Sequence, residues 1–170
     1  MKKLILIGSG AFEEQYSQTI MKTRFLRLSE EEREEVRQLM AAMDDPTVRD
    51  KDILLAKLGE LISKADTYKP LPHKKEVLAC HFDMYENIWR QASELRRRGT
   101  LLELGRNIQC PVVAIHGDYD PHDYRGVKIP LSHVLTDFRF ILLKNCGHQP
   151  WIEQEARVPF FTLLRRELQE

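Results

Sequence analysis

Two short clusters of acidic residues and histidines stand out in the second half of the sequence. Residues 115–122 read IHGDYDPH and include Asp118 and Asp120, while residues 144–151 read KNCGHQPW and include His148. A carboxylate beside an imidazole holds the ring in one tautomer and stabilises the imidazolium that forms when the histidine takes a proton from a nucleophile. Asp120 and His148 therefore have the residue types of an acid and a base that activate a nucleophile.

Each cluster directly follows a short, uninterrupted apolar run. The runs are Leu4–Ile7, Val112–Ile115 and Phe138–Leu143. Continuous hydrophobicity, without alternation, indicates strands that are covered on both faces, as in a parallel sheet between helices. Reacting groups gather at the carboxyl ends of such strands. We therefore expect an α/β fold in which the sheet brings the two clusters together.

The long stretch between the first two runs has helical spacing. Ser29 and Glu32 match a capping box, and 44–46 (Asp-Asp-Pro) should end the helix that it begins. Further helices are expected at Asp50–Ile62, about Lys74–Arg98 (with Val77 and Leu78 on its apolar side), Leu101–Arg106, Val127–Leu135 and Pro150 to about Leu168, with Pro150 in the first turn of the last.

The order of these features resembles the carboxyl-terminal half of α/β-hydrolases. Gly-x-x-Asp at 117–120 and Gly-His-x-Pro-Trp at 147–151 each follow a strand, and the family's triad runs serine, acid, histidine along the chain. The resemblance implies a partial α/β-hydrolase fold of about three parallel strands flanked by helices. Residues 1–11 and 108–170 would form the partial core, and residues 12–107 would form a helical cap insertion.

The resemblance also implies roles for single residues. Asp120 would orient His148, and His148 would carry the proton. Asp118 is a second candidate for the acid, but the family pattern places the acid three residues after the glycine, which favours Asp120. The alternative is that Asp120-Pro121 is a simple turn and that His148 only shapes the loop before the last helix.

No Gly-x-Ser-x-Gly nucleophile elbow occurs in the 170 residues. Ser9 is the nearest approximation, but Ile7 stands two positions before it, where the sharp elbow needs a small residue. We therefore interpret Ser9 as a substrate-side loop residue, together with Trp89 and His122. The resemblance implies that Met1 begins a truncated product or a reading frame inside a longer hydrolase gene.

Two functions remain open at this point. The first is serine-type hydrolysis of a small ester or amide by the complete protein, with this chain nearly inactive on its own because it lacks the nucleophile. The alternative is a non-catalytic α/β remnant that binds a small molecule or a protein partner. Either protein could form a homodimer through the exposed edge of Leu4–Ile7.

Composition excludes several other classes. Acidic and basic residues balance at 26 each, so no net field attracts nucleic acid or an anionic membrane. No segment approaches the roughly 20 apolar residues of a membrane span. The three cysteines, at 80, 110 and 146, are too far apart in sequence for a metal knuckle or redox pair, which favours a cytoplasmic protein.

Cofactor and metal sites are not expected. Gly8 and Gly10 resemble the start of a dinucleotide fingerprint, but Glu13 stands where its third glycine belongs and would repel a pyrophosphate. Histidines and carboxylates also crowd the first cluster, yet alternation at the end of a strand directs neighbouring side chains to opposite sides. The crowded residues are His116, Asp118, Asp120, His122 and Asp123.

Overall fold

The computed structural model describes residues 2–72 and 79–169. Three parallel strands form its sheet in the order β1 (Leu4–Ile7), β2 (Val112–Gly117) and β3 (Phe138–Leu143). β1 and β3 both pair with β2 in parallel, with Leu4 opposite Val112 and Val112 opposite Phe138. The predicted strands and their parallel arrangement are confirmed, and β2 continues two residues past the predicted Ile115.

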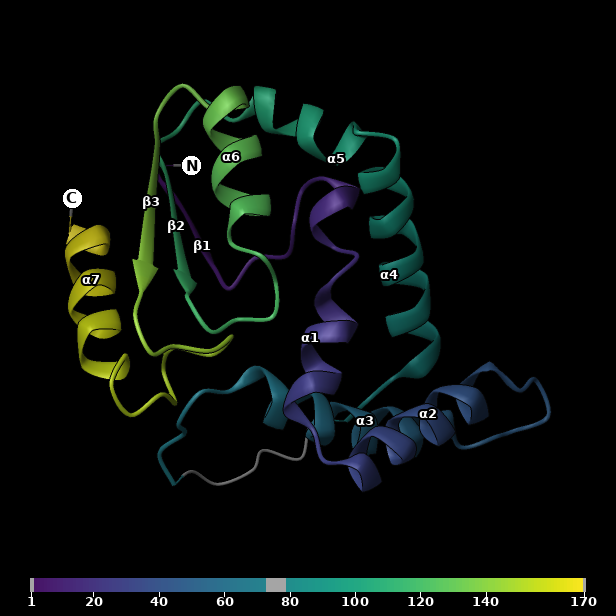
Figure 1. Ribbon diagram of the computed structural model, residues 1–170. Coiled ribbons are helices and arrows are strands. Elements are labelled where there is room, and N and C mark those ends of the chain that lie inside the picture. The colour runs from purple at the N-terminus through teal and green to yellow at the C-terminus, as the bar shows by residue number, and fades with distance from the viewer. Residues whose placement is uncertain (1, 73–78, 170) are drawn as a thin grey trace.

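Helices cover the sheet on both faces. α6 (Arg125–Val134) lies on one side of the strands and α7 (Arg157–Gln169) on the other (Figure 1). Every residue of β2 is buried. Along β1, Leu4 and Leu6 pack with the α6 side, whereas Ile5 and Ile7 pack with the α7 side. The continuous apolar runs thus reflect a sheet with two covered faces, as predicted.

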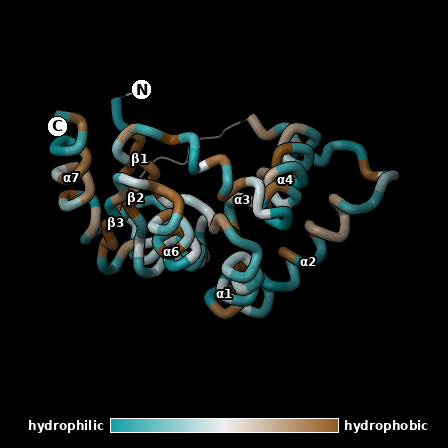
Figure 2. The backbone as a smooth tube through the Cα atoms, turned by 90° about the horizontal axis from the view of Figure 1, so that it is seen from above, coloured by the Kyte–Doolittle hydropathy of each residue, from teal (hydrophilic) through white to brown (hydrophobic). Residues whose placement is uncertain are grey.

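The segment between β1 and β2 is helical. Its first part has an apolar core of its own, which includes Leu28, Val36 and Leu58 and is separate from the two cores beside the sheet. Figure 2 shows the strands and α7 at one end of the molecule and α2 at the other. The elements are η1 (Glu14–Tyr16), α1 (Ile20–Arg27), α2 (Glu30–Asp44), α3 (Lys51–Asp66), α4 (Phe82–Arg97), α5 (Thr100–Glu103) and η2 (Leu104–Asn107).

Several local predictions can be compared with these elements. The capping box at Ser29 and Glu32 is confirmed, and α2 ends at Asp44 as expected. The prediction for α4 was wrong at its start, because residues 79–81 are not helical; the predicted positions 74–78 lie outside the described residues. α3 extends to Asp66, four residues beyond its predicted end.

The terminal helix was also predicted to begin too early. α7 begins at Arg157, and residues 150–156 form turns and one isolated bridge. The cause is Glu153, whose buried carboxylate accepts hydrogen bonds from the backbone N–H groups of Tyr68, Lys69 and Gly147. These contacts hold residues 150–156 against the segment after α3, so the chain cannot start a helix at Pro150.

β1 forms an edge of the sheet. It pairs with β2 and with no other described strand, and its side chains are partly exposed. Homodimer formation through this edge stays a prediction. In the described part of the chain, no helix combines the length and the hydrophobicity needed to cross a bilayer.

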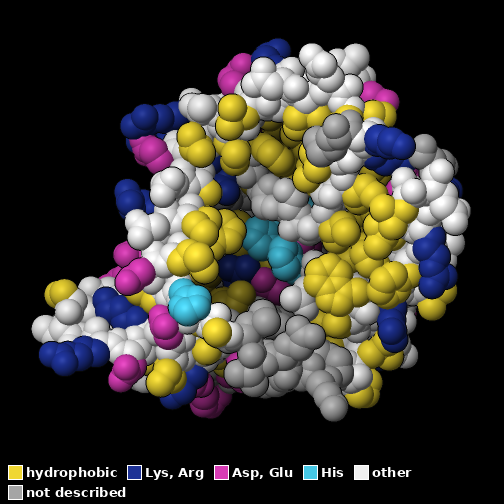
Figure 3. All heavy atoms as spheres, turned by 180° about the vertical axis from the view of Figure 1, so that it is seen from behind, with side chains coloured by type: hydrophobic (Ala, Val, Ile, Leu, Met, Phe, Trp, Pro, Cys, Tyr) yellow, Lys and Arg dark blue, Asp and Glu magenta, His cyan; other side chains and the backbone are white. Residues whose placement is uncertain are grey.

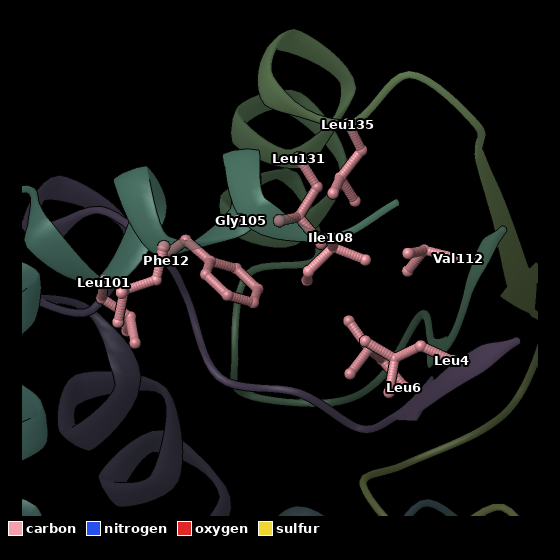
Figure 4. Close-up of a pocket in the computed structure, with 10 residues that line it drawn as sticks. Leu4, Leu6, Phe12, Leu101, Gly105, Ile108, Val112, Leu131 and Leu135 are labelled. Atoms are coloured by element: carbon pink, nitrogen blue, oxygen red, sulfur yellow. The ribbon is translucent and has the colours of Figure 1, made fainter. Parts of the chain in front are cut away.

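An apolar cavity of about 160 Å³ lies between the start of the sheet and the helices beside it (Figure 4). Leu4 and Leu6 of β1 form one side, and Leu131 and Leu135 of α6 lie across from them. No acidic residue or histidine lines the cavity. It is therefore a packing gap near the amino ends of the strands rather than the place of the predicted chemistry.

Candidate active site

Backbone hydrogen bonds connect the loop after β2 to the end of β3 and the loop that follows it. The N–H of Asp118 donates to the carbonyl of Leu143 at 2.9 Å, and the N–H of Tyr119 donates to the carbonyl of Cys146 at 2.9 Å. This approach requires glycine at 117, since a Cβ there would lie 2.1 Å from the carbonyl oxygen of Cys146. The two clusters singled out in the sequence thus meet at the carboxyl end of the sheet.

Asp120 and His148 are in direct contact. Their Oδ2 and Nδ1 atoms are 2.8 Å apart, and the carboxylate is buried. The backbone N–H of His148 donates to the carbonyl of Asp66, at the end of α3, at 2.9 Å. Gly8, with φ of 56°, lies against the other side of the histidine, where a Cβ would approach its carbonyl oxygen to 2.8 Å. The ends of β1, α3 and β3 therefore position His148 together.

A second histidine shares the same carboxylate. Nδ1 of His122 lies 2.8 Å from Oδ1 of Asp120, and the backbone N–H of His122 donates to that oxygen at 2.9 Å. The rings of His122 and His148 lie with centroids 4.9 Å apart. The sequence predicted His122 as a substrate contact, but nothing in it indicated that the side chain would compete with His148 for Asp120.

His116 completes the surroundings of the carboxylate. It is buried, its Nε2 lies 3.7 Å from Oδ2 of Asp120, and the same nitrogen is 3.3 Å from the carbonyl oxygen of Ser9. Viewed from the back of the molecule, histidine side chains lie in a hollow whose rim is largely hydrophobic (Figure 3). His148 is the most open of the group, with 34% of its side chain exposed.

The hydrogen bonds set the charge of the pair. Burial raises the pKa of Asp120, but the hydrogen bonds from His122 and His148 lower it by more, so the pKa lies well below its ordinary value. The hydrogen bond to Asp120 raises the pKa of His148, and burial opposes this rise only in part. The arrangement favours a carboxylate anion beside an imidazole that readily accepts a proton.

The side chains of the other predicted site residues form their described contacts with groups other than Asp120 and His148. Asp118 accepts a 3.3 Å hydrogen bond from the N–H of Cys146 and lies 3.5 Å from the ammonium of Lys144. The hydroxyl of Ser9 donates to the carbonyl of Gly10 at 3.4 Å, not to His148. Trp89, on α4, is 48% exposed, and its described ring contact is with another residue of that helix, Tyr85.

Cys146 is not a nucleophile in this arrangement. Its side chain is buried in the apolar core on the α7 side of the sheet, and burial together with nearby carboxylates raises the pKa of its thiol to about 12. A cysteine with so high a pKa is a thiol at neutral pH.

Sequence reasoning missed Asp66 and Glu153, which fix the backbone around His148. No local sequence pattern marks either residue, because Asp66 bonds to His148 and Glu153 to Tyr68 and Lys69, all more than 80 residues away in the chain.

Comparison with solved structures identifies the fold. The crystal structure of VinJ superposes with a TM-score of 0.54 and 18% sequence identity, over 98% of this chain and 57% of that one. The crystal structure of proline iminopeptidase from Mycobacterium smegmatis matches with a TM-score of 0.49 and 16% identity, over 98% of this chain and 56% of that one. The sequence matches no protein-family model and no curated protein.

The chain therefore spans a little over half the length of the solved structures that it matches. The predicted partial α/β-hydrolase fold with three parallel strands is confirmed. At this level of identity, the likeness establishes the fold and leaves the chemistry to the site itself.

Proposed function

We propose that this chain, whose fold is the carboxyl-terminal part of an α/β-hydrolase, provides the acid and the base of a hydrolase that cleaves a small ester or amide. The observation that carries the proposal is the 2.8 Å contact between Nδ1 of His148 and Oδ2 of Asp120, on adjacent loops at the carboxyl end of the sheet. The acid thus lies three residues after Gly117, as the family pattern requires.

In this proposal, His148 and Asp120 each have one part in the reaction. With Nδ1–H donating to Asp120, the free lone pair of His148 is on Nε2. That nitrogen would take the proton of a serine hydroxyl as its oxygen attacks the substrate carbonyl, and would then give the proton to the leaving alcohol or amine. Asp120 would stabilise the imidazolium between these steps. The serine would come from outside the 170 residues, since they contain no nucleophile elbow.

The surroundings suggest where the substrate would lie. We assign His122 and Ser9 to the substrate side, because the ring of His122 adjoins His148 and Ser9 follows Gly8, which contacts His148. We assign the exposed Trp89 of α4 to the substrate side as well. In the same proposal, residues 12–107 act as the cap and residues 1–11 and 108–170 as part of the core, with the separate apolar core of α1–α3 in support.

Hydrolysis of p-nitrophenyl acetate in EDTA tests the base. Without a serine, His148 can still act on water directly, so we expect slow turnover above the buffer rate. His148→Ala and Asp120→Asn should lose most of this excess, whereas His133→Ala, which removes an exposed histidine of α6, should retain it. Equal rates for His148→Ala and the wild type would rule out His148 as the base.

Covalent labelling tests the origin of the nucleophile. A fluorophosphonate probe should leave the mass of the intact chain unchanged, because no serine hydroxyl among the described residues forms a hydrogen bond with His148, and that of Ser9 donates to Gly10 instead. Labelling that disappears in Ser9→Ala would instead make Ser9 the nucleophile and overturn this part of the proposal. Absence of any His148-dependent turnover would favour the alternative, a non-catalytic α/β protein that binds a small molecule or a partner.

A further inference from the structure

Asp120, His122 and His148 form a group that acid–base chemistry alone does not require. One potential ligand atom from each residue lies within 4.8 Å of the other two. Each oxygen of the carboxylate faces the Nδ1 of a different imidazole, at 2.8 Å in both cases. A hydrolase base needs one imidazole on its acid, so the proton transfer does not require the second ring to contact Asp120.

Two imidazoles and one carboxylate are a common donor set for divalent transition-metal ions. We propose that Asp120, His122 and His148 bind one such ion, with Zn²⁺ as the best-matched candidate and a water molecule in its fourth position. This proposal does not depend on the proposed hydrolase activity.

The exchange of protons for a metal ion is balanced. In the hydrogen-bonded state, each Nδ1–H donates to Asp120; if the proton sits on Nε2 instead, the Nδ1 lone pair faces the carboxylate. A neutral imidazole makes this change without losing a proton, and an imidazolium at His148 releases one proton to solvent. Tetrahedral ligands at about 2.1 Å from Zn²⁺ are roughly 3.4 Å apart. The 2.8 Å contacts must therefore widen, and the wider separations in the group, which are up to 4.8 Å, must shorten.

Access and charge are compatible with a cation. The carboxylate is buried, but 34% of the His148 side chain is exposed, so an ion can approach from the side of that ring. The guanidinium of Arg24 acts on the charge of His148, but it is held in a two-pronged ion pair with Asp66 at 2.7 and 2.8 Å. This pairing reduces the repulsion that an isolated Arg24 would exert.

The sequence did not lead to this site. Strand alternation does separate Asp118 from the group, because its carboxylate faces Cys146 and Lys144. Alternation did not predict two features of this group: His122 turns back to the carboxylate two residues earlier, and His148 comes from a different loop. Sequence spacing within residues 115–123 could not reveal a ligand at 148.

Isothermal titration of the EDTA-treated, buffer-exchanged chain with Zn²⁺ tests the proposal. We expect one equivalent to bind, and His122→Ala to weaken binding by about tenfold or more. His133→Ala is the matched control, since it removes one histidine far from the group and should bind as the wild type does. A Cys80→Ser, Cys110→Ser variant should also bind normally, which excludes these two thiols as ligands.

Thermal unfolding provides an independent measurement. Zn²⁺ binds the folded state, so at equal concentration it should raise the Tm of the wild type and of His133→Ala by more than that of His122→Ala. Circular dichroism would verify that His122→Ala folds, and His148→Gln serves as a second ligand variant. Equal Zn²⁺ affinity in wild type and both ligand variants, or no saturable binding to the wild type, would overturn the proposal.

Discussion

Asp120 and Glu167 are two buried carboxylates at opposite ends of the same sheet, and their partners differ in kind. Asp120 lies past the carboxyl end of β2 and is bonded to the imidazoles of His122 and His148. Glu167 lies near the amino ends of the strands, where it pairs with Lys3 before β1 and with Arg139 on β3.

The difference separates an ion pair of fixed charge from one whose partners can change their protonation state. Lys and Arg keep their charge across the physiological range, so the interactions of Glu167 are fixed. Imidazoles gain and lose a proton near neutral pH and can exchange it for a metal ion. Burial raises the pKa of Glu167, but hydrogen bonds from Arg139 and Lys3 lower it by more. Burial of a carboxylate therefore indicates function only when its partners can change their state.

The largest effect should come from breaking the backbone approach on which the Asp120 end depends. In Gly117→Ala, the new Cβ would meet the carbonyl oxygen of Cys146 at 2.1 Å, so the two loops must separate. We expect a loss of about 3 kcal/mol in the free energy of unfolding, measured by urea denaturation. Gly59→Ala is the control, because a Cβ there meets nothing within 4 Å and should stabilise α3 by about 0.5 kcal/mol. Similar losses in both variants would contradict the explanation.

Removing the charge of Glu167 should lower the free energy of unfolding by less than Gly117→Ala does. Glu167→Gln leaves Lys3 and Arg139 beside a neutral amide, and breaking a buried ion pair is destabilising. Because 44% of the Arg139 side chain is exposed, we expect about 2 kcal/mol rather than the full effect of a wholly buried pair. Glu35→Gln, an exposed glutamate on α2, should change the free energy of unfolding by about 0.5 kcal/mol or less. A Glu167→Gln variant as stable as Glu35→Gln would show that the ion pairs contribute nothing.

Sequence reasoning identified the contact between Asp120 and His148 because both follow buried strands in one parallel sheet. The apolar runs of β2 and β3 fix where those strands end, and the carboxyl ends of parallel strands necessarily meet at one edge. The same reasoning found the start of α2, because a capping box is formed by residues three apart.

Features that depend on distant partners were not predictable. The start of α7 is delayed by Glu153, whose backbone partners Tyr68 and Lys69 lie more than 80 residues earlier in the chain. The sharing of Asp120 by His122 and His148 likewise depends on how one loop folds back over another. Local patterns fix elements, whereas tertiary hydrogen bonds decide how side chains at their ends are combined.

The pH dependence of stability should differ between the two ends. The lowered pKa of Glu167 contributes stability above its unfolded pKa, about 4.3, and this contribution is lost as the pH falls through the folded value. The raised pKa of His148 contributes stability that is complete below its unfolded pKa, about 6.5, and is lost as the pH rises through the folded value. The measurement is the urea midpoint as a function of pH, in EDTA. In Glu167→Gln, the decrease of the midpoint at acid pH should be smaller than in the wild type. In His148→Ala, the decrease between neutral and alkaline pH should be smaller. Unchanged profiles would mean that neither pair is linked to folding.

The smallest effect is expected at Asp118, and it distinguishes the two candidates for the acid. The ion pair of Asp118 with Lys144 is 3.5 Å long, and 78% of the lysine side chain is exposed, so it should contribute about 0.5 kcal/mol or less. In Asp118→Asn, the amide oxygen can still accept the hydrogen bond from Cys146. This variant should therefore keep both His148-dependent ester cleavage and Zn²⁺ binding, whereas Asp120→Asn should lose both. Loss of either property in Asp118→Asn would assign part of the site to the wrong carboxylate.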